Sequence, residues 1–420
     1  MSEVKRARLD YKECPYVATI DKHVLNFDFE KVCSISLSAQ NVYCCLVCGK
    51  YYQGRGFGTH AYEHSLEQDH HMFLKLEDGS VFCLPDNYEV NGTWEDIRQN
   101  LNPLFTAEEV DSFETASEPM LSVLGTEYIP GIVGLNKLGS ADYMSSVIQC
   151  LTTVIPFRRW FLLHATDDDI VCMRLGELFR KLFNPKSFRS CVSPHEFLQA
   201  VSTASKKTFF NQQGDAIAFL SWLVAHLQRK LRKTRLIDEC FTGHISVTTE
   251  SADEGMTTST STFNLLVIDL PATPVFKEES TLIPAVSIYD LLSKFDGVTE
   301  SVLANESKTY TIKQLPQYLI LAYRRFTSND FFAEKNATLV TGPIAGLDLS
   351  KYVAGNMQDI RYDLVAQVTH EGDAKSGSYK SFILNSPTGQ WFELQDLRVK
   401  PVLPQQVALA EAYIQIYRRV

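Results

Sequence analysis

One group of residues near the start of the chain has the types and spacing that metal binding requires. Cys45 and Cys48 form a CxxC pair, in which one tight turn offers two thiols to the same ion. Four histidines follow the pair: His60, His64, His70 and His71. Zn²⁺ takes four tetrahedral ligands from thiolates and imidazoles, and the clustered histidines argue against a redox CxxC. The sequence therefore predicts one structural zinc site, and spacing alone leaves open which two histidines complete it.

A second segment has the form of a cysteine-protease nucleophile loop that runs into a helix. From Gly134 to Leu151 its sequence is GLNKLGSADYMSSVIQCL, with Asp142 where the nucleophile would be. Carboxylates act as nucleophiles mainly toward sugars and phosphoryl groups. An aspartic-protease pair needs two carboxylates that share a proton, and distant Asp396 is a weak partner for that. Cys150 lies about two turns into the helix, so a small shift does not make it the nucleophile.

The composition is that of a globular protein with sizeable cores. The chain has 420 residues, of which 45% are hydrophobic and 21% charged, and its formal net charge is −10. Phosphate contacts need clustered Lys and Arg, so we expect no direct sequence-specific nucleic-acid binding. No apolar run is long enough to span a membrane, and the N-terminus has no apolar core of a secretory signal. We therefore expect the ten cysteines to be thiols or metal ligands.

Cysteine usage and polarity divide the chain into parts. Six of the ten cysteines crowd the first fifth of the sequence, which predicts a small metal-stabilised domain over residues 14–105 after a basic tail, 1–13. Residues 106–130 are polar and acidic, end in Pro and Gly, and are expected to be a linker. Residues 131–420 form the larger domain.

In the larger domain, hydrophobic periodicity predicts helices first and strands later. The expected helices are 142–163, 173–184, 194–205 and 213–232, and the expected strands are 242–249, 263–270, 317–324, 361–369, 379–385 and 390–394. The polar stretch Ser251–Ser261 is expected to be a loop. Helices followed by strands favour an α+β fold over repeated βαβ units.

Residues 14–105 resemble a UBP-type zinc finger. The run CPYVATIDKHVLNFDFEKVCSISLSAQNVYCCLVCGKYYQGRGFGTHAYEHSLEQDHH carries the resemblance. It implies that one zinc ion is bound by Cys45, Cys48, His64 and His70. The remaining cysteines of this domain lack the paired spacing of multi-zinc members and are expected to be small buried residues: Cys14, Cys33 and Cys83. Cysteines further along stand alone as well, so we expect zinc in the first domain only.

One position of the finger bears on ubiquitin. Arg55, in a Gly-Arg-Gly turn, matches an arginine with which some members clasp the free C-terminus of ubiquitin. Phe82 stands where those members often have Trp. The resemblance therefore leaves a weak ubiquitin contact open.

Residues 131–420 resemble the catalytic domain of ubiquitin-specific proteases, which has a papain-like fold. Its sequence boxes occur here in the family's order, which is far more specific than any one of them. They are Gly134–Leu151 (cysteine box), Gln212–Leu220 (glutamine-aspartate helix), Leu315–Leu321 with Arg324–Phe326 (central strand), Tyr362–Tyr379 (histidine box), and Trp391–Val399 with Ala412–Arg419 (closing strands).

All four positions of the family's chemistry are changed. Isopeptide cleavage needs a thiolate, an imidazole beside it, a group that orients the imidazole and an oxyanion donor. In that order the resemblance places there Asp142, Ser378, Gln395 and Lys137. His370 is expected to end a strand rather than to act as a displaced base. The expectation is a degenerate domain with no catalytic residues.

Asp142 also has a structural explanation. Aspartate is a good N-cap residue, and the helix dipole stabilises a carboxylate at that end by roughly 0.3–1 kcal/mol. We expect Asp142 to cap the helix that it begins, with Lys137 near enough to pair with it.

The combination of one-zinc finger, linker and degenerate protease domain resembles the inactive ubiquitin-specific protease-like factors of the spliceosomal tri-snRNP. Motifs such as FDFEKVCSISLS, CLPDNYE and VSPHEFLQAV carry this match. It implies a nuclear, non-catalytic scaffold that is a monomer within a larger complex, contacts tri-snRNP proteins, and supports assembly and pre-mRNA splicing. The stretch Lys5–Asp10 is then a nuclear import signal. Two alternatives stay open: a ubiquitin reader without protease activity, and an active deubiquitinase.

Overall fold

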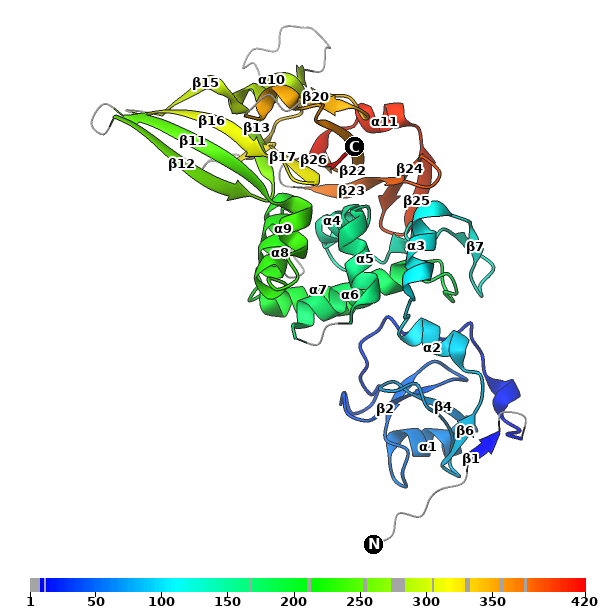
Figure 1. The fold of residues 1–420 in the computed structure, drawn as a ribbon. Coiled ribbons are helices and arrows are strands. Elements are labelled where there is room, and N and C mark those ends of the chain that lie inside the picture. Colours follow the sequence, from blue (N-terminus) through cyan, green and yellow to red (C-terminus); the bar gives the residue numbers. More distant parts are fainter. Residues whose placement is uncertain are drawn as a thin grey trace.

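The computed structural model describes residues 8–10, 13–165, 168–209, 213–251, 255–272, 284–303, 306–328, 333–354, 359–373 and 376–420. The expected import signal falls largely on residues 5–7, which lie outside the described residues, as does Gln212. Figure 1 shows two units, a smaller N-terminal one and a larger one in which helices lie against a sheet.

The N-terminal unit is a six-stranded sheet with strand order β1-β6-β5-β4-β2-β3. Side chains of β2 alternate between two cores, as the period of a strand requires: Val42 and Cys44 face the core that contains α2, and Tyr43 and Cys45 face the core that contains α1. The elements are β1 (Arg8–Asp10), η1 (Val17–Thr19), β2 (Val42–Cys45), β3 (Tyr51–Gln53), α1 (His60–Glu67), β4 (Met72–Lys75), β5 (Val81–Cys83), β6 (Tyr88–Asn91) and α2 (Glu95–Leu101).

The segment 106–130, expected to be a linker, is folded onto the larger unit. It contains helix α3 (Ala107–Thr115) and the hairpin of β7 (Met120–Leu121) and β8 (Glu127–Tyr128). Thr106 and Glu109 form a capping box at the start of α3, which satisfies two backbone donors that a helix start leaves free. Val110 and Tyr128 are buried in the main core of the larger unit, so this segment contributes to packing.

Six helices form one layer of the larger unit: α4 (Asp142–Leu151), α5 (Ile155–Leu163), α6 (Ile170–Leu182), α7 (His195–Ala204), α8 (Ala216–Lys230) and α9 (Leu236–Phe241). The prediction of one helix over 142–163 is wrong, because the chain turns between α4 and α5. Pro156 sits at the start of α5, where its missing N–H and fixed φ are tolerated, whereas inside a continuous helix it would remove a hydrogen bond. Helix α4 is buried along its whole length.

An eight-stranded sheet forms the second layer, with the order β13-β17-β26-β22-β23-β24-β25 and β21 paired to β22. Its strands are β13 (Leu266–Asp269), β17 (Tyr318–Arg324), β21 (Leu347–Asp348), β22 (Arg361–Gly372), β23 (Gly377–Asn385), β24 (Gln390–Gln395), β25 (Arg398–Val402) and β26 (Ala412–Arg419). One face packs on the helices, and the other face covers a second core (Figure 1). The expected α+β arrangement, with helices first and strands later in the larger unit, is confirmed.

A four-stranded sheet of order β12-β11-β16-β15 projects from one end of the larger unit (Figure 1). The prediction of a loop over Ser251–Ser261 is wrong, since β12 occupies most of it. Its Ser and Thr residues face solvent, so no alternation of apolar residues marks the strand. The strands are β11 (Gly243–Ser251), β12 (Gly255–Phe263), β15 (Asp296–Leu303) and β16 (Glu306–Gln314).

The remaining elements are short. They are β9 (Gly134–Leu135) paired with β10 (Cys191–Val192), β14 (Ala285–Ser287) with β20 (Leu339–Thr341), β18 (Phe326–Ser328) with β19 (Ala333–Lys335), α10 (Ile288–Leu292), η2 (Ser293–Phe295), η3 (Ser350–Tyr352) and α11 (Pro404–Ala408). Among the helices of the described residues, none has the length and hydrophobicity that crossing a bilayer requires.

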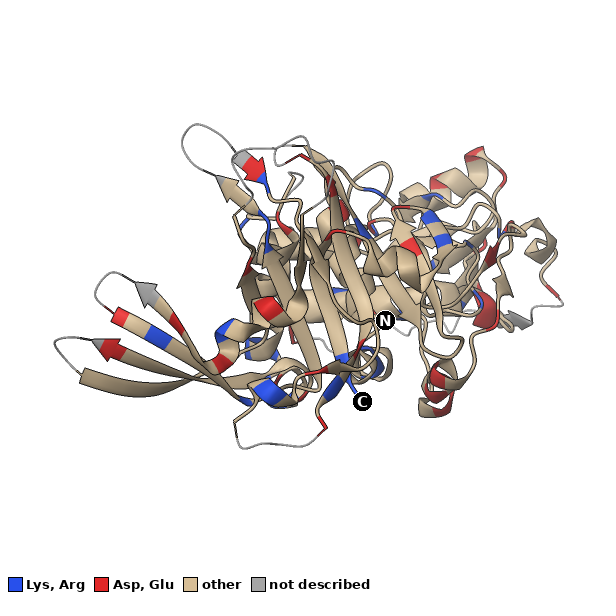
Figure 2. Cartoon of the chain, turned by 90° about the horizontal axis from the view of Figure 1, so that it is seen from above, with Lys and Arg blue, Asp and Glu red and all other residues tan. Residues whose placement is uncertain are grey.

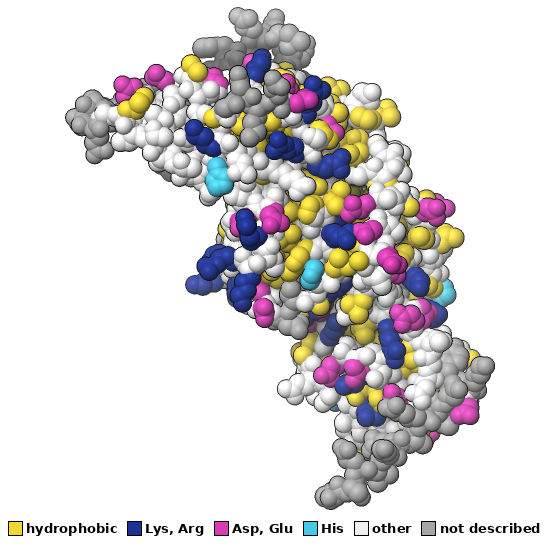
Figure 3. Space-filling model, in the orientation of Figure 1, with side chains coloured by type: hydrophobic (Ala, Val, Ile, Leu, Met, Phe, Trp, Pro, Cys, Tyr) yellow, Lys and Arg dark blue, Asp and Glu magenta, His cyan; other side chains and the backbone are white. Residues whose placement is uncertain are grey.

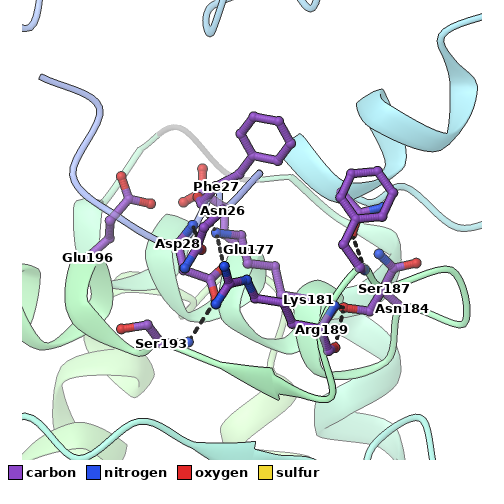
Figure 4. Close-up of polar contacts among 12 residues, drawn as sticks. Asn26, Phe27, Asp28, Glu177, Lys181, Asn184, Ser187, Arg189, Ser193 and Glu196 are labelled. Carbon is purple, nitrogen blue, oxygen red and sulfur yellow. Dashed lines mark hydrogen bonds and ion pairs between the residues drawn. The ribbon is translucent and has the colours of Figure 1, made fainter. Parts of the chain in front are cut away.

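A buried polar contact joins the two units (Figure 4). The carboxylate of Asp28 accepts a hydrogen bond from Lys181 Nζ at 2.9 Å and another from the backbone N–H of Ser193 at 2.9 Å. Lys181 also donates to the carbonyl of Phe27 at 2.9 Å. Phe188 of the larger unit lies in the apolar core of the smaller one. The two units therefore share a packed and charge-paired junction.

Candidate functional site

The structure brings four potential metal ligands of the N-terminal unit together: Cys45, Cys48, His64 and His70. Their ligand atoms all lie within 4.8 Å of one another. Cys48 Sγ is 3.5 Å from His64 Nε2, Cys45 Sγ is 3.6 Å from His70 Nδ1, and the two imidazole nitrogens are 3.1 Å apart. Two thiols and two imidazoles converging on one point fit the preference of Zn²⁺. Within the described residues, no other group of Cys, His, Asp or Glu converges in this way.

Local backbone structure positions these ligands. Cys45 ends β2, and the chain turns so that the N–H of Gly49 donates to the carbonyl of Cys45 at 2.8 Å. Gly49 has φ +75°, and a Cβ there would lie 2.5 Å from the carbonyl oxygen of Val24, so only glycine fits this turn without strain. A hydrogen bond from the Cys45 thiol holds the pKa of Cys48 well below its ordinary value, which favours the thiolate that binds metal.

The other two histidines of the cluster have different contacts. His71 Nδ1 lies 2.6 Å from the carbonyl oxygen of Leu84, and its Nε2 lies 2.9 Å from Asp69 Oδ1. His60 faces Glu63 at 3.9 Å on the first turn of α1. The geometry thus separates the histidines that spacing alone left equivalent.

Arg55 is held in place by contacts within the finger. Its guanidinium lies over the ring of Phe82, 4.0 Å from the ring centre, and its Nη1 donates to Asn87 Oδ1 at 2.7 Å. Phe82, on which Arg55 stacks, stands at the position where the resemblance to ubiquitin-binding fingers leads us to expect Trp. Both side chains are therefore engaged with each other, and Arg55 also with Asn87.

Asp142 begins α4 but is not its N-cap, which is Ala141. The carboxylate of Asp142 accepts one hydrogen bond from the backbone N–H of Tyr143 at 3.0 Å and one from that of Tyr379 at 3.1 Å. Burial raises its pKa, while these two donors and the charge of Lys137 oppose that rise. The side chain therefore ties the start of α4 to β23.

The other three positions lie around Asp142 on neighbouring elements. Ser378 is adjacent to Tyr379 in β23, and its Oγ accepts a hydrogen bond from Gln395 Nε2 at 3.2 Å. Lys137 pairs with Asp396, at 3.7 Å, rather than with Asp142. The expected Lys137–Asp142 pair is thus replaced by a Lys137–Asp396 pair. Sequence-distant positions do converge, but the groups that meet are a carboxylate, a hydroxyl, an amide and an ammonium.

Cys150 and His370, the other thiol and imidazole considered in the sequence, are held in buried positions. Cys150 is buried in the second half of α4, and burial raises the pKa of its thiol. His370 is buried in β22 against the edge of Tyr379, with ring centres 4.7 Å apart, and burial lowers its pKa. Neither lies in contact with Asp142.

Several contacts around this region have no signal in the sequence pattern. Ser381 Oγ donates to Gln149 Oε1 at 2.9 Å inside the core, and Tyr413 OH donates to Asp215 Oδ1 at 2.6 Å. Asp215 also caps α8, which a search for N-cap residues would find. Its second role depends on a strand almost 200 residues away and could not be read from spacing.

Both units match known families. Residues 133–417 match the family described as ubiquitin carboxyl-terminal hydrolase, and residues 33–94 match the family described as the Zn-finger in ubiquitin-hydrolases and other proteins. The chain belongs to the ubiquitin carboxyl-terminal hydrolase family and carries its UBP-type zinc finger.

Relatives that match over most of their length are more specific. The chain is 42% identical to mouse "Ubiquitin carboxyl-terminal hydrolase 39", over 100% of this chain and 81% of that protein. It is 33% identical to "Probable mRNA-splicing protein ubp10" of Schizosaccharomyces pombe, over 96% of this chain and 88% of that protein. A solved structure described as "Crystal structure of an essential yeast splicing factor" shares 25% identity with a TM-score of 0.83, and the match covers 96% of this chain and 99% of that one.

Proposed function

We propose that this protein is a non-catalytic scaffold of the spliceosomal tri-snRNP that supports its assembly and pre-mRNA splicing in the nucleus. The observation that carries the proposal is the likeness, over almost the whole chain, to a protein named for mRNA splicing and to the structure of an essential yeast splicing factor. These matches cover both the finger and the larger domain, so in the proposed role the two units act together.

The replaced chemistry supports a non-catalytic role. Thiol-dependent cleavage starts from a thiolate whose pKa is lowered by an imidazole. At the corresponding positions the chain has Asp142, which accepts two backbone hydrogen bonds, and Ser378, which bonds to Gln395. An electron-rich carboxylate engaged by backbone donors is a structural link and a poor nucleophile toward an amide.

Affinity purification of the full chain from nuclear extract tests the scaffold. Recovery of tri-snRNP proteins and their RNAs is expected, and splicing in extract depleted of the protein should be restored by adding it back. Recovery of ubiquitinated proteins alone would contradict the proposal.

A ubiquitin–fluorophore conjugate tests the absence of catalysis. The pure protein should release no fluorophore above the buffer rate at enzyme concentrations at which an active family member completes the reaction. Cleavage that disappears in Asp142→Ala would show that the domain is an active deubiquitinase.

We further propose that one structural zinc ion is bound by Cys45, Cys48, His64 and His70. The convergence of their donor atoms supports it. Zinc bound there would fix the β2 turn to α1 and the start of β4. Metal analysis of purified protein should give close to one zinc per chain, and a value near two would contradict a single site.

Ubiquitin reading is the second candidate, because Arg55 matches an arginine of ubiquitin-binding members and its guanidinium stacks on Phe82. Titration with ubiquitin that ends in an intact Gly-Gly tail distinguishes it. Saturable binding that is lost in Arg55→Ala would favour the reader, and the scaffold proposal expects none or only weak binding.

A further inference from the structure

A cavity opens on the flank of the larger unit where the expected linker folds back. It has a volume of about 300 Å³ and lies between α3, the turn from α4 to α5, the end of α6 and the turn from β23 to β24. Much of its wall is apolar, including Phe105, Phe113, Met120, Phe183, Ile383 and Pro387. None of these is among the four degenerate positions or the metal cluster, so the cavity is separate from both.

A buried arginine forms part of this cavity. Arg158 is 7% exposed, and its only hydrogen bond is a long one, 3.4 Å from Nη1 to the carbonyl of Thr152. Within the described residues, Nε and Nη2 are buried without an acceptor. The nearest anion is Glu114, whose Oε1 is 3.9 Å from Nη2 and is itself without a hydrogen bond. Buried donors without acceptors are costly, so this site is built to receive an acceptor such as a peptide carbonyl.

The segment that forms one side of the cavity is strongly acidic. Residues 99–136 contain no Lys, Arg or His. The acidic residues between 106 and 127 are Glu108, Glu109, Asp111, Glu114, Glu118 and Glu127. Asp111 pairs with Arg159, and Glu109 is used in the capping box. Among the described contacts, Glu108, Glu118 and Glu127 have no cationic partner, and Glu118 lines the cavity.

An apolar rim extends the cavity along the β7–β8 hairpin. Leu121 is 69% exposed and Leu124 is 50% exposed, and Val123 lies between them. Met120, the residue before Leu121, already lines the cavity. On the flank where Figure 1 places α3 and β7, Figure 3 shows hydrophobic side chains next to Asp and Glu. An exposed apolar patch rimmed by polar residues is characteristic of interaction surfaces.

We propose that this surface, here called the α3 cleft, binds an extended segment of a partner protein in which a bulky apolar side chain is flanked by Lys or Arg. The apolar side chain fills the cavity, the basic residues pair with Glu118 and its acidic neighbours, and backbone carbonyls meet Arg158. An acidic segment or a nucleic-acid backbone would be repelled by the same carboxylates. The proposal deepens the scaffold function and rests on it for the source of the partner.

The binding test uses a fluorescein-labelled synthetic peptide with one central Phe flanked on each side by Lys and Arg. Fluorescence anisotropy with the full-length protein should show saturable binding. Ala116→Trp, which fills the mouth of the cavity, and Glu118→Lys should each weaken binding at least tenfold. Glu108→Lys is the control for Glu118→Lys. It makes the same change of charge, but Glu108 lies on α3 and does not line the cavity, so the affinity should change less than threefold.

Two further peptides separate specific docking from general attraction. Replacing the central Phe by Ala, or all four basic residues by Glu, should abolish saturable binding. Equal affinity of the Phe and Ala peptides, or equal affinity of the wild-type and Ala116→Trp proteins, would overturn the proposal. Circular dichroism of each variant establishes that it is folded before affinities are compared.

Purification from nuclear extract distinguishes failure of this proposal from failure of the scaffold function. If wild type and Ala116→Trp recover the same tri-snRNP proteins and no peptide binds, the α3 cleft proposal fails and the scaffold stands. If the peptide binds as described but wild type recovers no tri-snRNP component, the scaffold fails and the docking site stands. The supporting result is loss of a specific subset of partners in Ala116→Trp.

Discussion

Asp142 is a structural link between two elements of the larger unit. Its carboxylate joins the first turn of α4 to the backbone of β23, two elements whose sequence positions differ by 237. Burial is the largest influence on its pKa and raises it, whereas the two backbone donors that hold the carboxylate lower it. The charge of this link is therefore favoured by its hydrogen bonds and opposed by its burial.

The first prediction concerns the protonation of this link. Because the folded-state pKa of Asp142 is raised, its contribution to stability is largest below the ordinary carboxyl pKa and falls as pH rises through the folded-state value. Asp142→Asn removes the charge but keeps only one of the two accepting oxygens, and its Nδ2 then faces a backbone N–H, so it should lower the free energy of unfolding at pH 7 by about 1 kcal/mol.

Urea unfolding at several pH values measures this effect. The stability of wild type relative to Asp142→Asn should rise as pH falls through the folded-state pKa of Asp142, because only the wild-type side chain takes up a proton there. Asp142→Ala lacks the acceptor altogether and should be less stable than Asp142→Asn at every pH. A wild-type advantage over Asp142→Asn that shrinks on acidification would contradict the raised pKa.

Single residues also show what could be inferred before the structure. Motif order placed Asp142, Ser378, Gln395 and Lys137 in one region, because a shared fold dictates where equivalent positions lie. The hydrogen-bond and ion-pair partners of these four residues could not be predicted, because they depend on the conformations of the side chains. The ion pair of Lys137 goes to Asp396, a residue with φ +52° that turns the chain after β24, and no local pattern specifies that turn.

At the scale of elements, the sequence predicted helices and strands correctly where burial requires a pattern of hydrophobic residues. It failed for elements that burial leaves without such a pattern. Strands such as β22 and β17 are almost wholly buried, and their Val, Ile and Tyr content marked them. Strand β12 is exposed on nearly every residue, so its Ser and Thr looked like a loop. The acidic segment before Gly131 looked like a linker because only a few of its residues, such as Val110, enter the core.

The second prediction concerns the elements that hold the metal ligands. If His64 binds zinc, His64→Ala should reduce the zinc content from about one per chain to well below half, because a three-ligand site is weaker and loses the tie between α1 and the β2 turn. His60→Ala is a matched control on the same helix, since His60 contacts only Glu63 within the described residues, at 3.9 Å.

Metal analysis after exhaustive dialysis checks this prediction, with proteolysis of the finger as a second readout. Retained zinc in His64→Ala together with loss in His60→Ala would assign the ligand to the other histidine. Equal zinc in both variants and in wild type would place the metal elsewhere.

The third prediction concerns the junction between elements of the two units. Asp28 accepts hydrogen bonds from Lys181 and Ser193 in a setting where the two charged side chains are 15% and 11% exposed. Asp28→Ala leaves a largely buried ammonium without its counter-charge, which costs about 3 kcal/mol. The finger should then detach more readily while each unit stays folded.

Small-angle scattering and limited proteolysis between the units measure that detachment. Glu30→Ala is the control, because Glu30 is exposed and contacts the larger unit only through a 3.4 Å bond from Gln199. A compact, protease-resistant Asp28→Ala protein would show that apolar contacts such as Phe188 hold the junction without the ion pair.

At the scale of the whole molecule, charge and shape suit a protein that binds other proteins. In Figure 2, basic and acidic residues are interspersed along the elements. The units are in contact but differ in how their cores form. The larger unit has two extensive apolar cores, and the finger has small ones that include Phe188 from its neighbour. If the finger binds zinc as proposed, its stability should depend on the metal and on the junction more than the stability of the larger unit does.

The last prediction follows from that dependence. A zinc chelator should unfold the finger and leave the body folded, and the body should lose the stabilisation that the junction gave it. Since about 1 kcal/mol shifts the melting temperature of a large domain by roughly 2–4 °C, the melting temperature of the body, meaning the larger unit, should fall by several degrees when the finger unfolds.

In Asp28→Ala the junction is already weakened, so chelator should lower the melting temperature of the larger unit by much less. Calorimetry of both proteins with and without chelator forms a thermodynamic cycle whose difference is the coupling free energy between the units. Equal shifts in the two proteins would mean that Asp28 transmits none of this coupling, and loss of the whole transition on chelation would mean that finger and body fold as one unit.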